Sequence, residues 1–291
     1  MNDNEINRIK QNYIKKADLS AYKYLIIDWS SKTPQHGLID TRGQWKEYIR
    51  LADLLNLTII QSPAPLLPSH NEGRRSSFLP SDYFNMNSFK FCGKKGRGVT
   101  ILESDSGIAR GEILTLKALN YNSGEFTMRD LRSTLKDSDI GDVQYEPSQN
   151  YKALADDFLC KNKIEACVHI RRGDRLKLGV PPMGISPEEM DYGTRSKNII
   201  DFLDYTEAPN SIYIMTDMKA EDQVVKELRN AKKYNFSFLY DYSELVSLKS
   251  KNNYDVFHLE WCIKNHEAIK FRSERFEPVI FYKNKHDLPQ T

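Results

Sequence analysis

Short apolar runs alternate with helical segments in the second half of the chain, and this alternation constrains the fold most strongly. Residues 166–170, 211–215, 236–240 and 268–271 have strand character, and segments with helical spacing or helix-start signals lie between them. Strands joined by helices run parallel, because each crossover returns the chain to the same edge of the sheet. The pattern predicts a doubly wound α/β sheet with ligands at the carboxyl ends of its strands.

The first half opens with a strand–helix–strand unit. Residues 24–27 and 58–60 have strand character, and apolar side chains between them, including Trp45 and Tyr48, recur at helical spacing. Residues 64–145 are less regular. A length of 291 residues suits two domains of ordinary size. We therefore predict a first domain of residues 1–150 and a second of residues 151–291.

The composition argues against several classes of protein. Lys+Arg of 42 against Asp+Glu of 40 gives a net charge of +2, which disfavours nucleic-acid binding. The cysteines have no metal-type spacing, so no metal site is expected. The amino terminus lacks the apolar core of a secretory signal, and no apolar run is long enough to cross a bilayer. The sequence thus predicts a cytoplasmic protein without an integral membrane segment. The four cysteines are Cys92, Cys160, Cys167 and Cys262.

The segment around Arg171 carries the clearest chemical signal. Arg171 and Arg172 follow a buried strand, and neighbouring residues at a strand end point to opposite faces. One guanidinium can therefore enter a cleft and bind two phosphate oxygens while the other braces the wall. Gly173 permits a sharp exit from the strand. Two surface arginines before a turn are an equally good interpretation, and an adhesion tripeptide at residues 172–174 is a weaker one.

Two later segments support a site at the same edge. Thr216 and Asp217 end the next strand, where Asp217 is either a ligand contact or a helix cap. Asp255 lies near a helix start and has the acceptors to bind a purine, although capping is the commoner role. Residues 271–273 end the last strand, and a helix beginning there would form an anion site with the Ser273 hydroxyl.

The order of these segments resembles the GDP-fucose-dependent fucosyltransferases. The shared motifs are His-x-Arg-Arg-Gly-Asp at 169–174, apolar-Thr-Asp ending at 217, and Asp-x6-Cys-x8-Phe-x-Ser at 255–273. The third motif is closest to the α-1,2 branch. Gly43-Gln44 and residues 52–58 resemble the family's amino-terminal Gly-Asn-Gln … Ala-x-Leu-Leu-Asn-Arg-Thr. The similarity covers both halves, with the middle of the first half unmatched.

The resemblance implies a GT-B fold, in which two Rossmann-like doubly wound domains face a cleft. The first would bind the acceptor and the second the nucleotide sugar. Arg171 would bind the β-phosphate with Arg172 beside it, and His169 and Asp255 would contact guanosine. The full donor-binding set implied by the family and the neighbouring strand ends is His169, Arg171, Arg172, Thr216, Asp217, Asp255, Phe271, Arg272 and Ser273.

The expected activity is inverting, metal-independent transfer of L-fucose from GDP-fucose to a glycan hydroxyl, without a cofactor. Arginine can stabilise the leaving group as a divalent cation would. Gly43 stands at the family's Asn, and Arg272-Ser273 replaces a Ser-Ser pair. Another donor, such as UDP-xylose or a nucleotide-linked rhamnose, and a non-catalytic nucleotide- or sugar-binding protein therefore remain alternatives. Arg171 and Asp174 are the candidate catalytic residues. Glu188, Glu189 and Asp191 are further candidates for the base, which stays unassigned.

Overall fold

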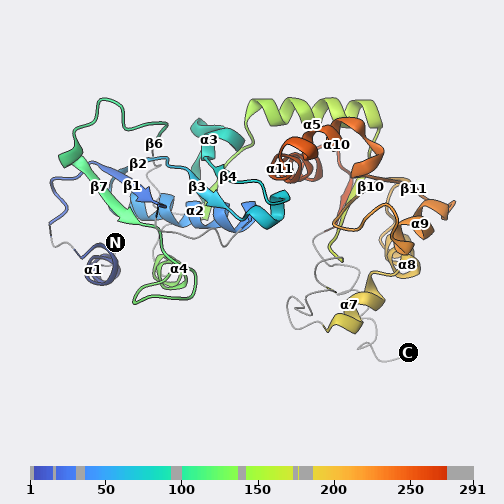
Figure 1. Ribbon diagram of the computed structural model, residues 1–291, viewed down its shortest axis with the longest axis horizontal. Coiled ribbons are helices and arrows are strands. Elements are labelled where there is room, and N and C mark those ends of the chain that lie inside the picture. The colour runs from blue at the N-terminus through green and yellow to red at the C-terminus, as the bar shows by residue number, and fades with distance from the viewer. Residues whose placement is uncertain are drawn as a thin grey trace. The chain divides into compact units, whose positions relative to one another are not determined.

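The computed structural model divides the chain into two compact units, residues 1–150 and 151–291. It describes residues 3–15, 18–30, 37–92, 100–136, 142–172, 176 and 186–273. Both units are mixed α/β structures built on a four-stranded parallel sheet (Figure 1). The acceptor-side and donor-side roles expected for the two halves stay predictions.

The first unit contains a parallel sheet of β1, β2, β6 and β7 and two small antiparallel pairs, β3 with β4 and β5 with β8. The expected strands at 24–27 and 58–60 are confirmed. The sheet order is β6-β2-β1-β7. The elements of this unit are α1 (Asp3–Ile9), the π-helical turn η1 (Lys10–Ile14), β1 (Tyr24–Asp28), α2 (Leu38–Leu54), β2 (Thr58–Ile60), β3 (Ala64–Leu66), η2 (Pro68–Asn71), β4 (Ser76–Phe78), α3 (Pro80–Tyr83), η3 (Met86–Ser88), β5 (Lys90–Cys92), β6 (Ile101–Leu102), η4 (Arg110–Glu112), β7 (Ile113–Lys117), α4 (Met128–Lys136) and β8 (Asp142–Gln144).

One face of the first sheet packs against α2. Trp29, which follows β1, lies with its ring centroid 6.0 Å from that of Trp45 and 5.7 Å from that of Tyr48, both on α2. The Tyr48 hydroxyl accepts a hydrogen bond of 2.7 Å from the Leu119 amide. Leu25 and Ile27 are fully buried on the same side of β1 as Trp29. This face forms the core of the unit.

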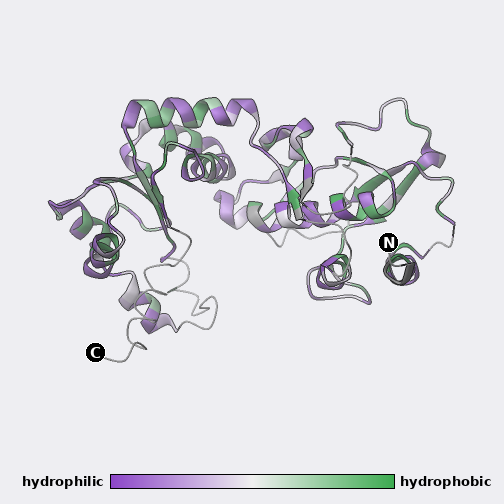
Figure 2. Ribbon diagram, turned by 180° about the vertical axis from the view of Figure 1, so that it is seen from behind, coloured by the Kyte–Doolittle hydropathy of each residue, from purple (hydrophilic) through white to green (hydrophobic). Residues whose placement is uncertain are grey.

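The second unit has the strand order β11-β10-β9-β12, with every pairing parallel. The strand expected at 166–170 is observed at those residues, whereas the one expected at 268–271 is limited to two residues because 266–270 form turns. In Figure 2, green hydrophobic residues are visible along strands of the first unit. The elements are α5 (Gln149–Asn162), which begins before the division between units, β9 (Ala166–Ile170), α7 (Pro187–Gly193), α8 (Ser196–Tyr205), β10 (Ser211–Thr216), α9 (Gln223–Asn230), β11 (Asn235–Phe238), η6 (Leu239–Asp241), α10 (Ser243–Lys251), α11 (Asn253–Lys264) and β12 (Phe271–Arg272).

Helices cover both faces of the second sheet. Val168 and Ile170 of β9 pack with Phe202 of α8 and Val225 of α9 in one hydrophobic core. On the opposite face, Tyr213 of β10 contacts α5 and α11 through ring and hydrogen-bond contacts. A parallel sheet buried on both faces needs nearly continuous apolar strands, as β9 and β10 have. The fold class expected from the sequence, parallel α/β, is confirmed for this unit.

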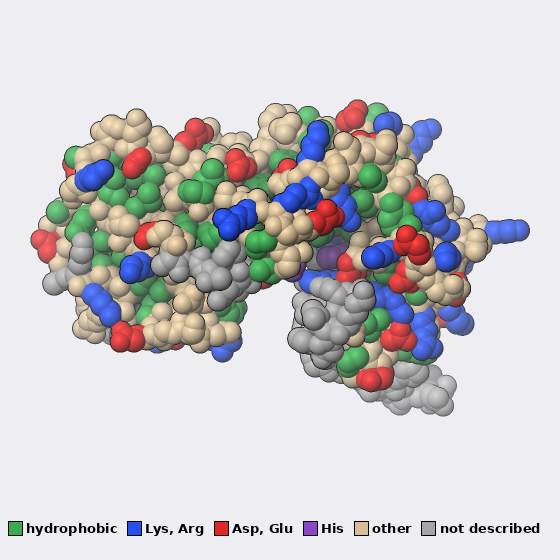
Figure 3. All heavy atoms as spheres, viewed as in Figure 1, with side chains coloured by type: hydrophobic (Ala, Val, Ile, Leu, Met, Phe, Trp, Pro, Cys, Tyr) green, Lys and Arg blue, Asp and Glu red, His purple; other side chains and the backbone are tan. Residues whose placement is uncertain are grey.

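The described helices give no candidate for a membrane span, since none combines sufficient length with sufficient hydropathy. On the face shown in Figure 3, Lys and Arg side chains are interspersed with Asp and Glu side chains. This distribution fits the balanced composition of the chain, in which local arrangement rather than a global field must select a charged ligand.

Candidate functional site

The site expected in the second unit lies where the order of its strands reverses. The chain runs from β9 to β10 and β11 on one side, and then returns to place β12 on the other side of β9. In doubly wound sheets, ligands bind beyond the carboxyl ends of the strands at this reversal. Arg171 follows β9 directly, and Ser273 follows β12. Parallel pairing therefore brings two of the predicted segments to the reversal point.

Three hydrogen bonds connect three of the predicted motifs. The Arg172 amide donates to Asp217 Oδ1 at 2.8 Å, which joins the ends of β9 and β10. The His169 amide donates to Ser273 Oγ at 3.3 Å, and the Ser273 amide donates to the Cys167 carbonyl at 3.0 Å. Residues far apart in the sequence are thus held together at one edge of one sheet.

Asp217 is not the cap of α9, the next helix along the chain. The helix that follows it, α9, is capped by Asp222, whose Oδ1 accepts from the Val224 amide at 2.9 Å. Asp217 instead accepts the Arg172 amide and fixes the end of β9. The capping interpretation of Asp217 is therefore wrong, because the chain turns through residues 217–222 before α9 begins. Its neighbour Thr216 accepts a hydrogen bond from the Met218 amide at 3.1 Å.

The guanidinium of Arg172 binds α7 and the residue after it. It donates to Thr194 Oγ1 at 2.7 Å and to the Asp191 carbonyl at 3.1 Å, and it forms an ion pair with the Asp191 carboxylate. Arg195 binds the second oxygen of the same carboxylate. The side chain of Arg172 is 14% exposed. Arg172 is thus the arginine with a structural role, since its guanidinium holds α7 and Thr194 against the end of β9.

The bases considered downstream of the arginines have structural partners or lie outside the described residues. Burial alone would raise the pKa of Asp191, but hydrogen bonds from Arg195 and Arg172 outweigh it and lower that pKa. Glu189 completes a capping box with Ser186 at the start of α7. Glu188 is exposed in the first turn of the same helix. Asp174 lies outside the described residues, as does the anion-binding helix expected after Ser273.

Arg171 is half-buried and belongs to the opposite face. Side chains alternate along a strand, so Arg171 falls on the side of Cys167 and His169, away from the core formed with α8 and α9. The Arg172 guanidinium therefore lies against α7, whereas alternation assigns Arg171 to the face that α11 covers. This separation leaves Arg171 as the better candidate for a ligand contact.

The remaining predicted residues lie on α11 and β12. Asp255 is in the first turn of α11, where its Oδ1 accepts from Asn252 Nδ2 at 2.9 Å, and Asn252 is the helix cap. Capping was the commoner role considered for Asp255, and Asn252 performs it instead. Phe271 packs on Phe202 with ring centroids 6.2 Å apart, whereas Arg272 is exposed.

The sequence analysis did not predict a buried polar cluster in the second unit, formed by Tyr213, Glu260 and Cys167. Tyr213 donates from its hydroxyl to Glu260 Oε1 at 2.7 Å. Burial raises the pKa of Glu260 to about 7, although the hydrogen bond from Tyr213 acts in the opposite direction and lowers it. Burial and the nearby Glu260 raise the pKa of Cys167 to about 12. The signal available in the sequence was Glu260 within the otherwise apolar stretch 259–263 of α11.

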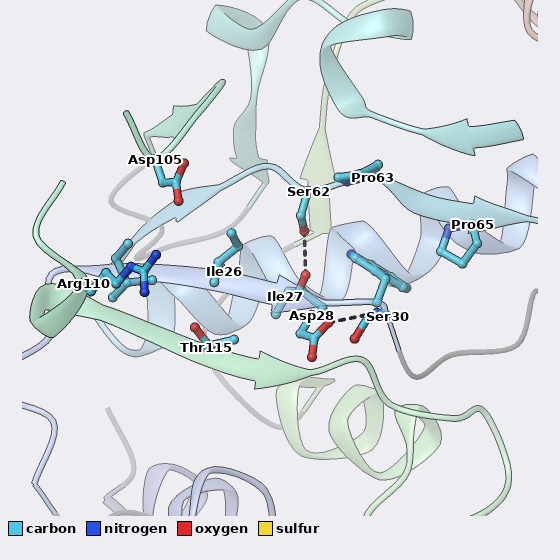
Figure 4. Close-up of a pocket in the computed structure, with 12 residues that line it drawn as sticks. Ile26, Ile27, Asp28, Ser30, Ser62, Pro63, Pro65, Asp105, Arg110 and Thr115 are labelled. Atoms are coloured by element: carbon cyan, nitrogen blue, oxygen red, sulfur yellow. Dashed lines mark hydrogen bonds between the residues drawn. The ribbon is translucent and has the colours of Figure 1, made fainter. Parts of the chain in front are cut away.

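The first unit contains a pocket of about 760 Å³ beside β1 and β7 (Figure 4). Asp28 closes β1, and its Oδ1 accepts from the Ser30 amide at 2.9 Å. Hydrogen bonds from Ser30 lower the pKa of Asp28. Sequence reasoning missed these residues, although Asp-Trp-Ser directly after the first strand was a usable signal. The lining comprises Ile26, Ile27, Asp28, Trp29, Ser30, Ser62, Pro63, Pro65, Asp105, Arg110, Ile113 and Thr115.

Gly43 and Gln44, which resembled a donor- or acceptor-contacting motif, lie within α2. Gln44 is buried. Among the described residues there is no group of three or more His, Cys, Asp or Glu side chains that could hold a metal ion.

Comparison with solved structures finds the same fold in a fucosyltransferase-like neighbour. A crystal structure of POFUT1 in complex with GDP matches with a TM-score of 0.50 at 10% sequence identity, covering 89% of this chain and 99% of that one. A structure of POFUT1 in complex with GDP-fucose matches with a TM-score of 0.49 at 9% identity, covering 89% and 98%. No family model and no curated protein sequence matches. The chain therefore shares the mixed α/β fold of POFUT1, with parallel sheets and helices.

Proposed function

We propose that this protein is a glycosyltransferase of the fucosyltransferase type, which uses a nucleotide-sugar donor and a glycan hydroxyl as acceptor. GDP-fucose is the proposed donor. The observation that carries the proposal is the divided pair of arginines at the strand reversal, where Arg172 braces α7 and Arg171 belongs to the other face. The fold shared with POFUT1 and the order of the three motifs support it.

In this proposal the two units form a GT-B arrangement, and Arg171 binds the diphosphate of the donor. A guanidinium fork matches two phosphate oxygens and stays charged throughout the reaction. It would stabilise the charge that develops on the leaving diphosphate, so the reaction would need no metal or other cofactor. A single displacement, in which the acceptor oxygen bonds to the sugar carbon as the bond to the diphosphate breaks and the hydroxyl proton passes to a base that is unassigned, would invert that carbon. Asp217 acts by holding the backbone of Arg172, and Ser273 by joining β12 to β9.

The test is donor binding and turnover by the full chain. GDP should raise the melting temperature more than UDP does, because a ligand that binds the native state stabilises it. Among GDP-fucose, UDP-xylose and nucleotide-linked rhamnose, GDP-fucose should be consumed in the presence of a glycan acceptor, at a rate that EDTA does not change. Arg171→Ala should lower turnover by about 10²- to 10³-fold.

Lys232→Ala is the matched control, since it removes an exposed cation of the same unit. Arg171→Lys retains the charge but loses the fork, so it should recover only part of the rate. Consumption of UDP-xylose or a rhamnose donor alone would reassign the donor. GDP binding without turnover would identify a non-catalytic binding protein. An unchanged rate in Arg171→Ala would overturn the role of this residue.

A further inference from the structure

The pocket of the first unit also lies at a strand reversal. The chain passes from β1 to β2 and β6, and then returns to place β7 on the other side of β1. This is the same third-second-first-fourth order as in the second sheet. Ile26 and Asp28 of β1 and Ile113 and Thr115 of β7 line the pocket. Asp28, Ser30 and Ser62 bring one end of the pocket to the carboxyl ends of β1 and β2, where the general rule for doubly wound sheets places ligands. The rest of the pocket extends over the face of the strands.

The pocket exists because one face of this sheet is incompletely covered. In β7, Leu114 and Leu116 are buried, whereas Ile113 is half-buried and Thr115 is exposed. Ile26 is half-buried on the corresponding face of β1. Parallel sheets are normally covered on both faces by crossover helices. Here the connection from β6 to β7 is residues 103–112, whose regular structure is the short turn η4, and its Asp105 and Arg110 line the pocket.

The lining combines an apolar floor with a polar rim. Ile26, Ile113 and two prolines, Pro63 and Pro65, provide carbon surface, and Trp29 adds an aromatic wall. The rim consists of the carboxylates of Asp28 and Asp105, the guanidinium of Arg110, and the hydroxyls of Ser30, Ser62 and Thr115. Two carboxylates against one guanidinium make the rim net negative, so it disfavours phosphate. A pocket of this volume is of the size that holds small ligands.

We propose that this pocket binds a neutral saccharide, whose ring lies on the apolar floor and whose hydroxyls donate to Asp28. A carboxylate is an acceptor with several lone-pair sites, and two adjacent sugar hydroxyls are donors that fit it. Figure 4 shows the Asp28 carboxylate beside Ser30 at the end of β1. That this saccharide is the glycan acceptor rests on the proposed function; its binding to the pocket does not.

The experiment measures saccharide binding to the full chain without any donor. Saturation-transfer NMR is recorded with lactose, maltotriose and methyl N-acetylglucosaminide, and with galactose 1-phosphate and glucuronate as anionic probes. At least one neutral saccharide should bind more tightly than both anions. Asp28→Asn should weaken that binding about tenfold, because a hydrogen bond to a charged group is lost. Thr115→Trp should abolish it by filling the space over β7.

Asp18→Asn is the matched control, since Asp18 Oδ1 accepts from the Ser20 amide at 2.8 Å in the same kind of turn, outside the pocket. It should bind saccharide as the parent chain does, and melting temperatures establish that all variants fold. The proposal is overturned if no neutral saccharide binds, if the anions bind better, or if Asp28→Asn and Asp18→Asn behave alike. Saccharide binding without donor turnover would overturn the proposed function and leave the pocket proposal standing. Transfer that Asp28→Asn leaves unchanged, with saccharide binding weakened, would overturn only the assignment of the bound saccharide as the acceptor.

Discussion

The two parallel sheets have the same strand order but differ in how helices cover their faces. In the second unit, α8 and α9 cover one face, and α5 and α11 contact the other. Four of its predicted ligand residues, Arg171, Arg172, Asp217 and Ser273, directly follow strand ends. In the first unit, α2 covers one face, and the other carries a pocket on the strands themselves. The same topology therefore supports a site at an edge in one unit and on a face in the other.

The length of one connection accounts for this difference. In the second unit the chain passes from its third strand to its fourth through α10 and α11, which provide a helix against β9 and β10. In the first unit the corresponding connection is residues 103–112, which contain only η4 as regular structure. A chain that omits a covering helix gains a concave, partly apolar surface. The comparison teaches that such a surface can arise by shortening a connection, without a change of strand order.

The largest expected effect is the loss in free energy of unfolding when neighbouring residues of one strand are replaced by alanine. In β10, Ile212 and Tyr213 are both fully buried on opposite faces, so Ile212→Ala should cost about 3 kcal/mol and Tyr213→Ala about 4 kcal/mol. In β7, Leu114→Ala should cost about 3 kcal/mol, whereas Thr115→Ala should stay within about 0.5 kcal/mol. Native-state hydrogen exchange measures the opening free energy of each sheet separately.

Each variant is its neighbour's control, because the two members of a pair share a strand and differ only in the face they occupy. Equal losses for Leu114→Ala and Thr115→Ala would mean that both faces of the first sheet are packed, which breaks the comparison. A small loss of stability for either β10 variant would mean that one face of the second sheet is not packed, which would also contradict the comparison.

Local sequence patterns predicted the second sheet better than the first. The runs at 166–170 and 211–215 are almost uninterruptedly apolar because both faces of their strands are buried, and the strands lie where they were expected. The strand β7, with the sequence Ile-Leu-Thr-Leu-Lys, was missed, since a strand buried on one face has a weaker signal. Helices α4, α8 and α10 were also missed, because tertiary packing rather than a strong local pattern defines them.

The same distinction applies to the sites. Motif order predicted which strand ends meet, because parallel topology fixes that meeting. It could not predict that the Arg172 guanidinium binds Asp191, which depends on how α7 packs. It also gave no warning that Glu260 is fully enclosed beside Tyr213, since helical periodicity does not show which helix faces a sheet. Contacts between elements decide these features.

A second prediction uses Glu260 to test how completely α11 covers its sheet. The folded protein holds the Glu260 proton up to a pKa of about 7, whereas the unfolded chain releases it near the ordinary glutamate pKa of 4.5. Between these values the unfolded state binds fewer protons, so the free energy of unfolding falls as pH rises. Glu260→Gln removes this penalty and should stabilise the second unit by about 3 kcal/mol at pH 8, with little effect at pH 4.

Urea unfolding of both proteins across this range isolates Glu260, because all other titrating groups are common to them. Glu165→Gln, which removes a carboxylate paired with Lys270 at the surface, should change stability by at most about 1 kcal/mol. A Glu260→Gln variant that is less stable at pH 8 would mean that water reaches this carboxylate and that the helix layer is open.

The smallest expected effect on stability concerns the carboxyl ends of β9 and β1, which different contacts hold in place. The end of β9 is braced by the pair of Arg172 and Asp191, whereas the end of β1 is held by the turn of Asp28 and Ser30. Arg172→Ala removes charge-assisted bonds to Asp191 and Thr194 and should lower the stability of the second unit by about 2 kcal/mol. Arg172→Lys should recover part of this loss, because it keeps the charge but not the fork.

The readout that separates bracing from direct ligand binding is the GDP-induced rise in melting temperature. If Arg172 acts only through α7, the Arg172→Ala protein melts at a lower temperature but still gains most of the parent's increment with GDP. If its guanidinium binds the diphosphate directly, the increment disappears while the ligand-free stability hardly changes. The second outcome would make Arg172 a donor-binding residue. It would also mean that the pair of Arg172 and Asp191 stabilises the end of β9 no more than the turn of Asp28 and Ser30 stabilises the end of β1.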